Sequence, residues 1–348
     1  KEYEGYVTDL ITDFALDWLK ERDQDRPFML MYHHKAPHRP WQPDETHADL
    51  YEDIDIPEPE TLWDDYRNRA TAASQAEMRV DRDLNPRDLK QDVPEGLSPE
   101  DEKRWKYQRY IKDYLRCVAS VDDNVGRLLD YLDEQGLSEN TVVAYTSDNG
   151  MFQGEHGWVD KKMMYEESLR VPFLVRYPEE IAAGSHSDDM VINLDYASTF
   201  LAYAGQDVPV DIQGSSLVPL LGGNTPDDWR TVFYYQHFDI HPDGELANCG
   251  VRTKDFKLIW YNHNYDHYQL FDLKKDPSET RDVSEDPEYA STVDQMKALL
   301  REERERIGLT DELEEQIFNS GDVSQTRKRM GALLEMVDAN IRDRLSCR

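Results

Sequence analysis

Short apolar runs of strand length, each following a helical pattern and each ending in polar residues, constrain the fold of this chain most. The segment from Val7 to about Arg22 carries apolar residues at roughly helical spacing and predicts an amphipathic helix. The run Phe28–Tyr32 follows after a short polar turn, and such a run is typical of a strand buried on both faces of a parallel sheet. A helix followed by a buried strand predicts an α/β fold.

The same order recurs further along the chain. A helical pattern extends from Ser98, a capping residue, to Gln135, and Gly136 is a natural stop. The runs Thr141–Thr146 and Val171–Val175 then predict a second and a third buried strand. Residues 42–100, in contrast, are rich in Pro, Asp and Glu and predict long surface loops with short helical pieces.

The character of the sequence changes near residues 222–223. Alternating aromatic stretches around 232–238, 256–261 and 268–273 predict a small antiparallel sheet. From about residue 288 to the end the chain is charged and helical in pattern, as expected of a solvated helix that covers the small sheet. We therefore expect a main domain over residues 1–222 and an α+β subdomain over residues 223–348.

Composition limits the classes of partner. The 348 residues, 39% of them hydrophobic, are enough for a packed core. The net charge of −32 would repel nucleic acid and anionic membrane surfaces, and no window approaches 18 apolar residues. Two explanations of the acidity remain open, namely solubility in a salty medium and the gathering of cations near a metal site.

The cysteines indicate neither a disulfide framework nor a zinc site. Cys117, Cys249 and Cys347 are odd in number, far apart and without metal-ligand spacing. We interpret them as ordinary thiols.

Polar residues follow the predicted strands where an open α/β sheet places its ligands. Three imidazoles and two cations lie within residues 33–41, and Asp148-Asn149 offers hard oxygen donors suited to calcium or magnesium. Lys161 is a compact charge suited to a sulfate or phosphate oxygen. Taken singly, each has a plainer interpretation: a structural histidine for His38, a turn for Asp-Asn-Gly, and a surface lysine.

Taken together and in this order, these segments resemble the sulfatase family of the alkaline phosphatase superfamily. The resemblance covers nearly the whole chain up to about residue 300. The matching segments are HHKAPHRPW (33–41), YTSDNGMFQGEHGWVDKKMMYEESLRVPF (145–173), INLDYASTFLAYAG (192–205), IQGSSLVPLL (212–221) and YQLFDLKKDPSETRDV (268–283). The resemblance implies an alkaline-phosphatase-like three-layer domain with a smaller C-terminal subdomain.

The resemblance also implies roles for individual residues. Asp148 and Asn149 would be two ligands of a calcium ion, with magnesium as the alternative metal. Lys161 and His38 would contact the sulfate group, and His38 would also donate a proton to the departing alcohol. The neighbouring side chains that would contact substrate are His34, Lys35, His156 and Lys162.

The departures from the family pattern are equally informative. Sulfatases use a formylglycine made from cysteine in Cys-x-Pro/Ala-x-Arg, but Val-Ala-Ser-Val follows Cys117 and Gly-Val-Arg-Thr follows Cys249. The Asp-Asp pair that completes the calcium site is also missing, since Asp122-Asp123 falls inside the long predicted helix, where adjacent side chains diverge. We therefore expect a fragment that is inactive alone, whose incomplete sheet exposes apolar faces and makes it poorly soluble.

The complete enzyme is expected to remove sulfate from a sulfated sugar. Residues 33–44 and 56–70 look most similar to enzymes acting on N-acetylglucosamine-6-sulfate or related sugars of heparan and mucin. Trp41 and Trp158 suit either a sugar face or the core. The alternatives are a phosphoesterase or phosphonate hydrolase of the same superfamily and a non-catalytic binding protein. The family implies a periplasmic or secreted enzyme, and the residues specify no oligomeric state.

Overall fold

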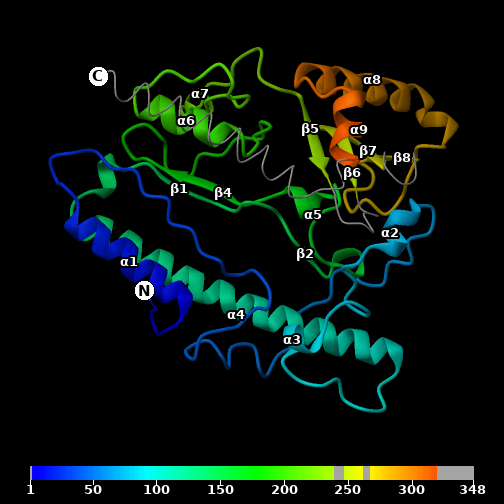
Figure 1. The fold of residues 1–348 in the computed structure, drawn as a ribbon, viewed down its shortest axis with the longest axis horizontal. Helices are drawn as coiled ribbons and strands as arrows, with labels where there is room; N and C mark the ends of the chain where they lie inside the picture. The colour runs from blue at the N-terminus through cyan, green and yellow to red at the C-terminus, as the bar shows by residue number, and fades with distance from the viewer. Residues whose placement is uncertain (1, 239–246, 262–266, 320–348) are drawn as a thin grey trace. The chain divides into compact units, whose positions relative to one another are not determined.

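The computed structural model describes residues 2–238, 247–261 and 267–319 (Figure 1). Its helices are α1 (Val7–Glu21), α2 (Thr71–Gln75), α3 (Pro86–Leu89), α4 (Pro99–Glu134), α5 (Glu166–Leu169), α6 (Asp195–Tyr203), α7 (Val218–Leu221), α8 (Ala290–Arg306) and α9 (Asp311–Asn319), with short 3-10 turns at Ser138–Asn140, Glu155–Gly157 and Pro287–Tyr289. Its strands are β1 (Val143–Thr146), β2 (Phe152–Gln153), β3 (Val159–Asp160), β4 (Phe173–Arg176), β5 (Val232–His237), β6 (Asn248–Thr253), β7 (Phe256–Tyr261) and β8 (His267–Asp272).

The chain divides into two compact units. The first contains residues 1–64, 77–161 and 167–229, and the second contains residues 65–76, 162–166 and 230–348. The second unit thus includes two short segments from earlier in the chain, which a boundary at residues 222–223 does not anticipate. Each unit is described by itself.

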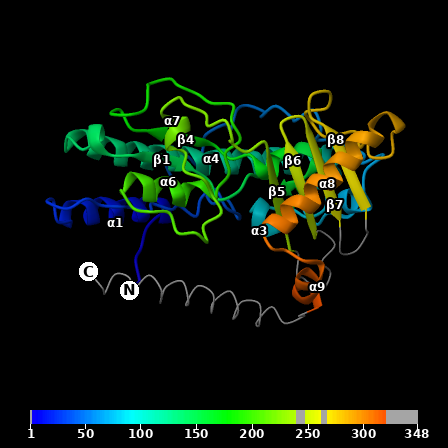
Figure 2. The same ribbon diagram turned by 90° about the horizontal axis from the view of Figure 1, so that it is seen from above.

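Helices α1 and α4 lie side by side in the first unit (Figure 1, Figure 2). Both helices were predicted within a residue of their ends. The Ser98 side chain caps α4 by accepting from the backbone N–H of Asp101, and Gly136 follows the helix with φ +66°. Asn124 of α4 donates from Nδ2 to Asp9 Oδ1 of α1 at 2.7 Å, so polar contacts join the two helices.

The segment Phe28–Tyr32 was predicted to be a strand, and this prediction is wrong, because the segment is not a strand in the described structure. The segment has no strand partner among the described residues, and Met29 and Met31 are 63% and 70% exposed. An extended segment becomes a strand only when a neighbouring strand satisfies its backbone N–H and C=O groups. The apolar run predicts the extended conformation but cannot supply the partner.

The second and third predicted strands form, but with a different pairing. β1 and β4 form a two-stranded antiparallel sheet in which Ala144 is opposite Val175, so the parallel arrangement expected from the apolar runs is wrong for this pair. Neither strand is fully buried, and Leu174 is 61% exposed. The apolar faces of this pair are therefore open, as expected.

The second unit contains the predicted antiparallel sheet, in the order β5-β6-β7-β8. Helix α8 packs on one face, and the core between helix and sheet consists of Val251, Leu258, Leu270, Val283, Tyr289, Val293, Met296 and Leu300. The predicted helical tail is confirmed as far as α8 and α9. The remainder of the tail, residues 320–348 with Cys347, lies outside the described residues.

Candidate functional site

One face of α4 supports the segments that carry the candidate residues. Tyr110 is fully buried, its ring lies 4.5 Å from that of Trp41, and its hydroxyl donates to the backbone oxygen of Phe152 at 3.2 Å. One turn further on, the Tyr114 hydroxyl accepts from Gln153 Nε2 at 3.0 Å. The helix therefore holds the end of the 33–41 loop and the first strand of the β2–β3 hairpin on the same face, because residues i and i+4 lie one above the other.

The hairpin limits how far Lys161 can lie from the end of β1. β2 pairs with β3 so that Phe152 is opposite Asp160. Phe152 lies three positions after Asn149, and Lys161 directly follows Asp160. Chain connectivity therefore limits the Cα distance between Asn149 and Lys161 to about 21 Å.

Asp148 and Asn149 follow the end of β1 after one residue, Ser147, as predicted. The carboxylate of Asp148 is exposed, and the nearest polar group that contacts it is the Ser147 hydroxyl, at 3.4 Å from Oδ1. Asn149 donates from Nδ2 to the backbone oxygen of Gly150 at 2.7 Å. The turn requires glycine, because a Cβ at Gly150 would lie 2.1 Å from the backbone oxygen of Glu167.

These two residues fit a calcium site only in part. Carboxylate and amide oxygens are suitable ligands, and Asp148 has no ion pair among the described residues. Calcium requires six to eight oxygen ligands, however, so further ligands are needed. Within residues 2–238, 247–261 and 267–319, no group of three or more His, Cys, Asp and Glu side chains could hold a metal ion.

His38 lies on an exposed turn that is joined to the Lys161 segment through its neighbour. The backbone N–H of His38 donates to Lys35 O at 2.9 Å, and its Nδ1 lies 3.0 Å from Arg39 O. Arg39 Nη1 lies 3.8 Å from Asp160 Oδ2, and Asp160 Oδ1 lies 3.3 Å from Lys161 Nζ. One arginine and one aspartate thus connect the loop of His38 to Lys161.

The other predicted contacts in the first unit differ in accessibility. Lys35 is exposed, whereas His34 is partly buried, with its ring 4.4 Å from that of Tyr32. Burial lowers the pKa of His34 below its ordinary value of 6.5 and so disfavours the charged imidazolium. Both ring nitrogens of His34 are buried, so the imidazole offers no hydrogen-bonding group to a substrate in this conformation.

His156 is fully buried. Its Nδ1 lies 2.8 Å from Asp64 Oδ2, and its ring lies 5.2 Å from that of Trp158. A ring with no exposed surface cannot touch a substrate in this conformation, so the geometry is that of a support for the hairpin. Trp41 and Trp158 are also buried, which decides between their two interpretations in favour of the core.

Lys162 belongs to the second unit. Its backbone oxygen accepts from the Tyr235 hydroxyl at 3.0 Å and from Asn248 Nδ2 at 3.1 Å. The described contacts fix its backbone next to the start of β6 and the middle of β5.

Cys117 and Cys249 are free, buried thiols, in agreement with the prediction of ordinary thiols. Burial raises the pKa of Cys117 to about 11 and that of Cys249 to about 12. The nucleophilic form of cysteine is the thiolate, and these thiols are protonated at neutral pH. Neither thiol is suited to act as a nucleophile at neutral pH.

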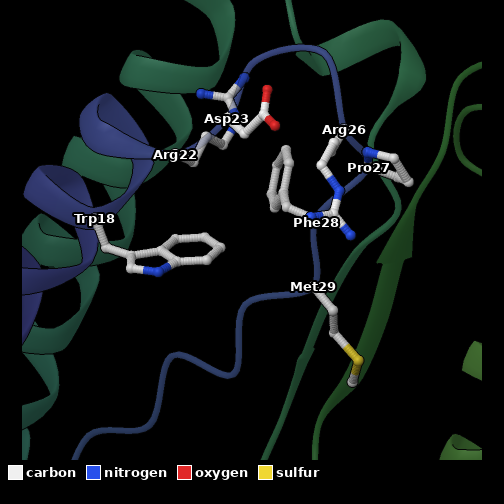
Figure 3. A pocket seen from close by; sticks show the side chains of 7 residues that line it. All are labelled: Trp18, Arg22, Asp23, Arg26, Pro27, Phe28 and Met29. Carbon is white, nitrogen blue, oxygen red and sulfur yellow. The ribbon is translucent and has the colours of Figure 1, made fainter. Parts of the chain in front are cut away.

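A hollow of about 360 Å³ lies away from these residues (Figure 3). The rings of Trp18 and Phe28, which line it, are in an edge-to-face arrangement with their centroids 6.2 Å apart, and the Arg22 guanidinium lies 5.0 Å from the Phe28 ring. None of the predicted site residues lines it. The hollow adjoins the unpaired segment after Phe28, so we interpret it as a consequence of the open strand region.

Arg39 and Asp160 were not predicted to belong to the site. Each is one charged residue among many, and only their positions beside His38 and Lys161 could have drawn attention to them.

Two family models match the chain. The model described as Sulfatase matches residues 1–206, and the model described as N-sulphoglucosamine sulphohydrolase, C-terminal, matches residues 154–306. The N-acetylglucosamine-6-O-sulfatase of Bacteroides thetaiotaomicron is 39% identical over 91% of this chain and 65% of its own length. The human N-acetylglucosamine-6-sulfatase is 29% identical over 65% of this chain and 38% of its own length.

Solved structures are similar over most of the chain. A protein solved in complex with its substrate D-glucosamine-2-N,6-O-disulfate matches with a TM-score of 0.84 and 38% identity, covering 89% of this chain and 71% of that one. A phosphonate monoester hydrolase from Silicibacter pomeroyi matches with a TM-score of 0.70 and 23% identity, covering 88% and 61%, and shows the fold alone. The predicted alkaline-phosphatase-like fold with a C-terminal subdomain is confirmed. The chain spans 65% and 60% of the length of the first two curated relatives.

Proposed function

The chain belongs to the sulfatase family, and we propose that it supplies much of the active site of an enzyme that hydrolyses the 6-O-sulfate ester of an N-acetylglucosamine-type sugar. The 39% identity to an N-acetylglucosamine-6-O-sulfatase supports the substrate class. The observation that carries the catalytic proposal is the contact of Asp160 with both Lys161 and Arg39, because it joins the Lys161 segment to the His38 loop.

Lys161 holds a sulfate oxygen and stabilises the negative charge that develops in the transition state. His38 contacts the sulfate group as well, and its exposed imidazole donates a proton to the departing sugar hydroxyl. Asp148 and Asn149 provide two oxygen ligands for a calcium ion, or for magnesium as the alternative. Formylglycine, if bound in the family manner, would supply the nucleophilic hydroxyl, and no Cys-x-Pro/Ala-x-Arg motif for it is among the residues of this chain.

Lys35 of the first unit contacts the sugar and Lys162 is a separate candidate contact on the second unit, whereas His34, whose ring nitrogens are buried, supports its own loop. His156 is a support in this scheme, because its ring is buried. We also propose that residues 1–222 belong to the catalytic domain and residues 223–348 to the C-terminal subdomain, and that the enzyme works in the periplasm or outside the cell. Among the described residues, no helix has both the length and the apolar character needed to cross a membrane.

The test joins this chain to the part of the Bacteroides relative that it does not match, where the family pattern would require the formylglycine, and measures sulfate release from N-acetylglucosamine-6-sulfate. Lys161→Ala is expected to lower kcat/KM by about 100- to 1,000-fold, as expected for loss of a transition-state contact. A phenylphosphonate monoester is the control substrate. Hydrolysis of the phosphonate without release of sulfate would contradict the proposal and favour the phosphonate hydrolase alternative.

A further inference from the structure

Four charged side chains of the first unit form a continuous chain of ion pairs. Arg39 donates from Nε to Asp88 Oδ1 at 3.0 Å, and its Nη2 contacts the other oxygen of the same carboxylate. The third guanidinium nitrogen, Nη1, lies 3.8 Å from Asp160 Oδ2. The second oxygen of Asp160 lies 3.3 Å from Lys161 Nζ. Asp160 is therefore shared by two cations.

The Arg39–Asp88 end of this row of ion pairs is held firmly. The Asp88 side chain is 3% exposed, and Asp88 takes part in the capping box of α3 with Asn85. The two-point contact with Asp88 fixes the plane of the Arg39 guanidinium, so that Nη1 points in one direction. The Lys161 side chain is 30% exposed and is the accessible end.

The backbone at Asp160 supports a special placement of its side chain. Asp160 has φ +75°, in the left-handed region that non-glycine residues seldom adopt, although it ends strand β3. Its carboxylate lies between Arg39 and Lys161 in this conformation. An extended backbone would direct the side chain to one face of the hairpin instead.

We propose that Asp160 is a positioning residue that holds the Lys161 ammonium in place and, through Arg39, fixes its distance from the His38 loop. The inference rests on the proposed function for its catalytic meaning, but the holding of Lys161 can be tested without it. The four charges sum to zero, so the network orients Lys161 without adding positive charge to the site. Removal of the Asp160 charge should therefore strengthen attraction of an anionic ester while the ammonium loses its fixed position.

The first test measures the reactivity of Lys161 in this chain. Limited acylation with acetic anhydride at neutral pH, followed by peptide mass spectrometry, reports how freely the amine reacts. Asp160→Asn should raise the labelling of Lys161 by about twofold to fivefold, the range expected for loss of one partly exposed ion pair. Asp160→Glu keeps the carboxylate and should restore most of the protection, provided that circular dichroism shows both variants folded.

The matched control is Asp255→Asn. Asp255 contacts Lys274 Nζ at 2.8 Å in an exposed pair of the second unit. This variant should raise the labelling of Lys274 and leave Lys161 unchanged. Equal labelling of Lys161 in the wild type and in folded Asp160→Asn overturns the proposal, whatever the enzyme hydrolyses.

The second test uses the formylglycine-bearing enzyme described above. Asp160→Asn should lower kcat by about tenfold or more while KM stays constant or falls, because positioning is lost but attraction of the anion is not. A fall in kcat with a parallel rise in KM would overturn the positioning role. If Lys161 labelling changes as expected but no sulfate ester is hydrolysed, the proposed function fails and the hold of Asp160 on Lys161 stands.

Discussion

The strand segments of the first unit and the sheet of the second differ in how their apolar residues are covered. In the second unit α8 covers one face of the four-stranded sheet, so Leu258 of the inner strand β7 and Leu270 of the edge strand β8 have no exposed surface. In the first unit β1 and β4 have only each other among the described strands, and Leu174 is 61% exposed. Similar apolar runs thus lead to a closed core in one unit and to an open sheet in the other, because strand burial depends on partners from elsewhere in the chain.

The largest effect should come from a buried lysine in the second unit. Lys257 has no exposed surface and contacts Glu166 Oε1 at 2.8 Å and Glu279 Oε1 at 2.6 Å. Lys257→Ala leaves two carboxylates without this cation and should lower the free energy of unfolding of this unit by about 3–5 kcal/mol at pH 7. Hydrogen exchange of peptides covering β7 and β8 measures the loss.

Lys274→Ala is the control, because Lys274 forms an exposed ion pair with Asp255. It should change the same free energy by about 0–1 kcal/mol. Equal effects of the two substitutions would show that the cluster around Lys257 contributes nothing beyond a surface pair.

The comparison of the two sheets is tested directly by a pair of leucines. Leu270→Ala removes a fully buried side chain from the core beneath α8 and should cost about 2–5 kcal/mol. Leu174→Ala removes a largely exposed side chain from β4 and should change stability by less than about 0.5 kcal/mol. Denaturant-dependent hydrogen exchange of β8 and β4 peptides gives both values, and a large cost for Leu174→Ala would show that the first unit's sheet is covered.

Acid should weaken the second unit through Glu166. Burial alone would raise the pKa of this carboxyl, but the Lys257 charge and hydrogen bonds from Arg252 and Lys257 lower it from 4.5 to about 2. A lowered pKa means that the ionised form stabilises the fold, so the contribution is complete above about pH 4.5 and is lost as the pH falls toward 2. The full contribution is on the order of 3 kcal/mol.

Glu166→Gln should therefore flatten the decline of stability between about pH 5 and 3. The difference between the wild-type and variant curves isolates this carboxyl from Glu279, whose pKa burial raises. Parallel curves over this interval would show that Glu166 gains no stability from its cationic partners.

Local signals account for what could be predicted from the sequence. Helices α1 and α4 were predicted because their periodicity and the cap at Ser98 lie within one continuous segment. Strand β6 was missed because Asn248, Cys249 and Gly250 carry no alternating pattern. Phe28–Tyr32 has the pattern of a strand, but pairing is decided by distant segments, and none of the described strands pairs with it.

In the candidate site, too, local features could be predicted and contacts between distant segments could not. The strand-end position of Asp148 and Asn149 could be predicted, because a polar turn directly after an apolar run is a local feature. The link between Arg39 and Asp160 could not, because it joins residues 121 positions apart through a hairpin whose register the sequence does not specify.

Substitution of Met29 and Met31 should have the smallest effect on stability but a clear effect on self-association. Met29→Gln and Met31→Gln replace exposed side chains of the unpaired segment and should change the unfolding free energy by less than about 0.5 kcal/mol. An unpaired, exposed apolar segment is a template for pairing with another chain, so the double variant should remain monomeric at higher concentration than the wild type. Light scattering against protein concentration measures the concentration at which association begins.

Leu313→Gln, which changes an exposed residue of helix α9, is the control and should leave the association threshold unchanged, because a helix satisfies its own backbone. If both changes raise the association threshold equally, any added polar side chain on the surface lowers association, and the exposed segment around Met29 and Met31 has no special role.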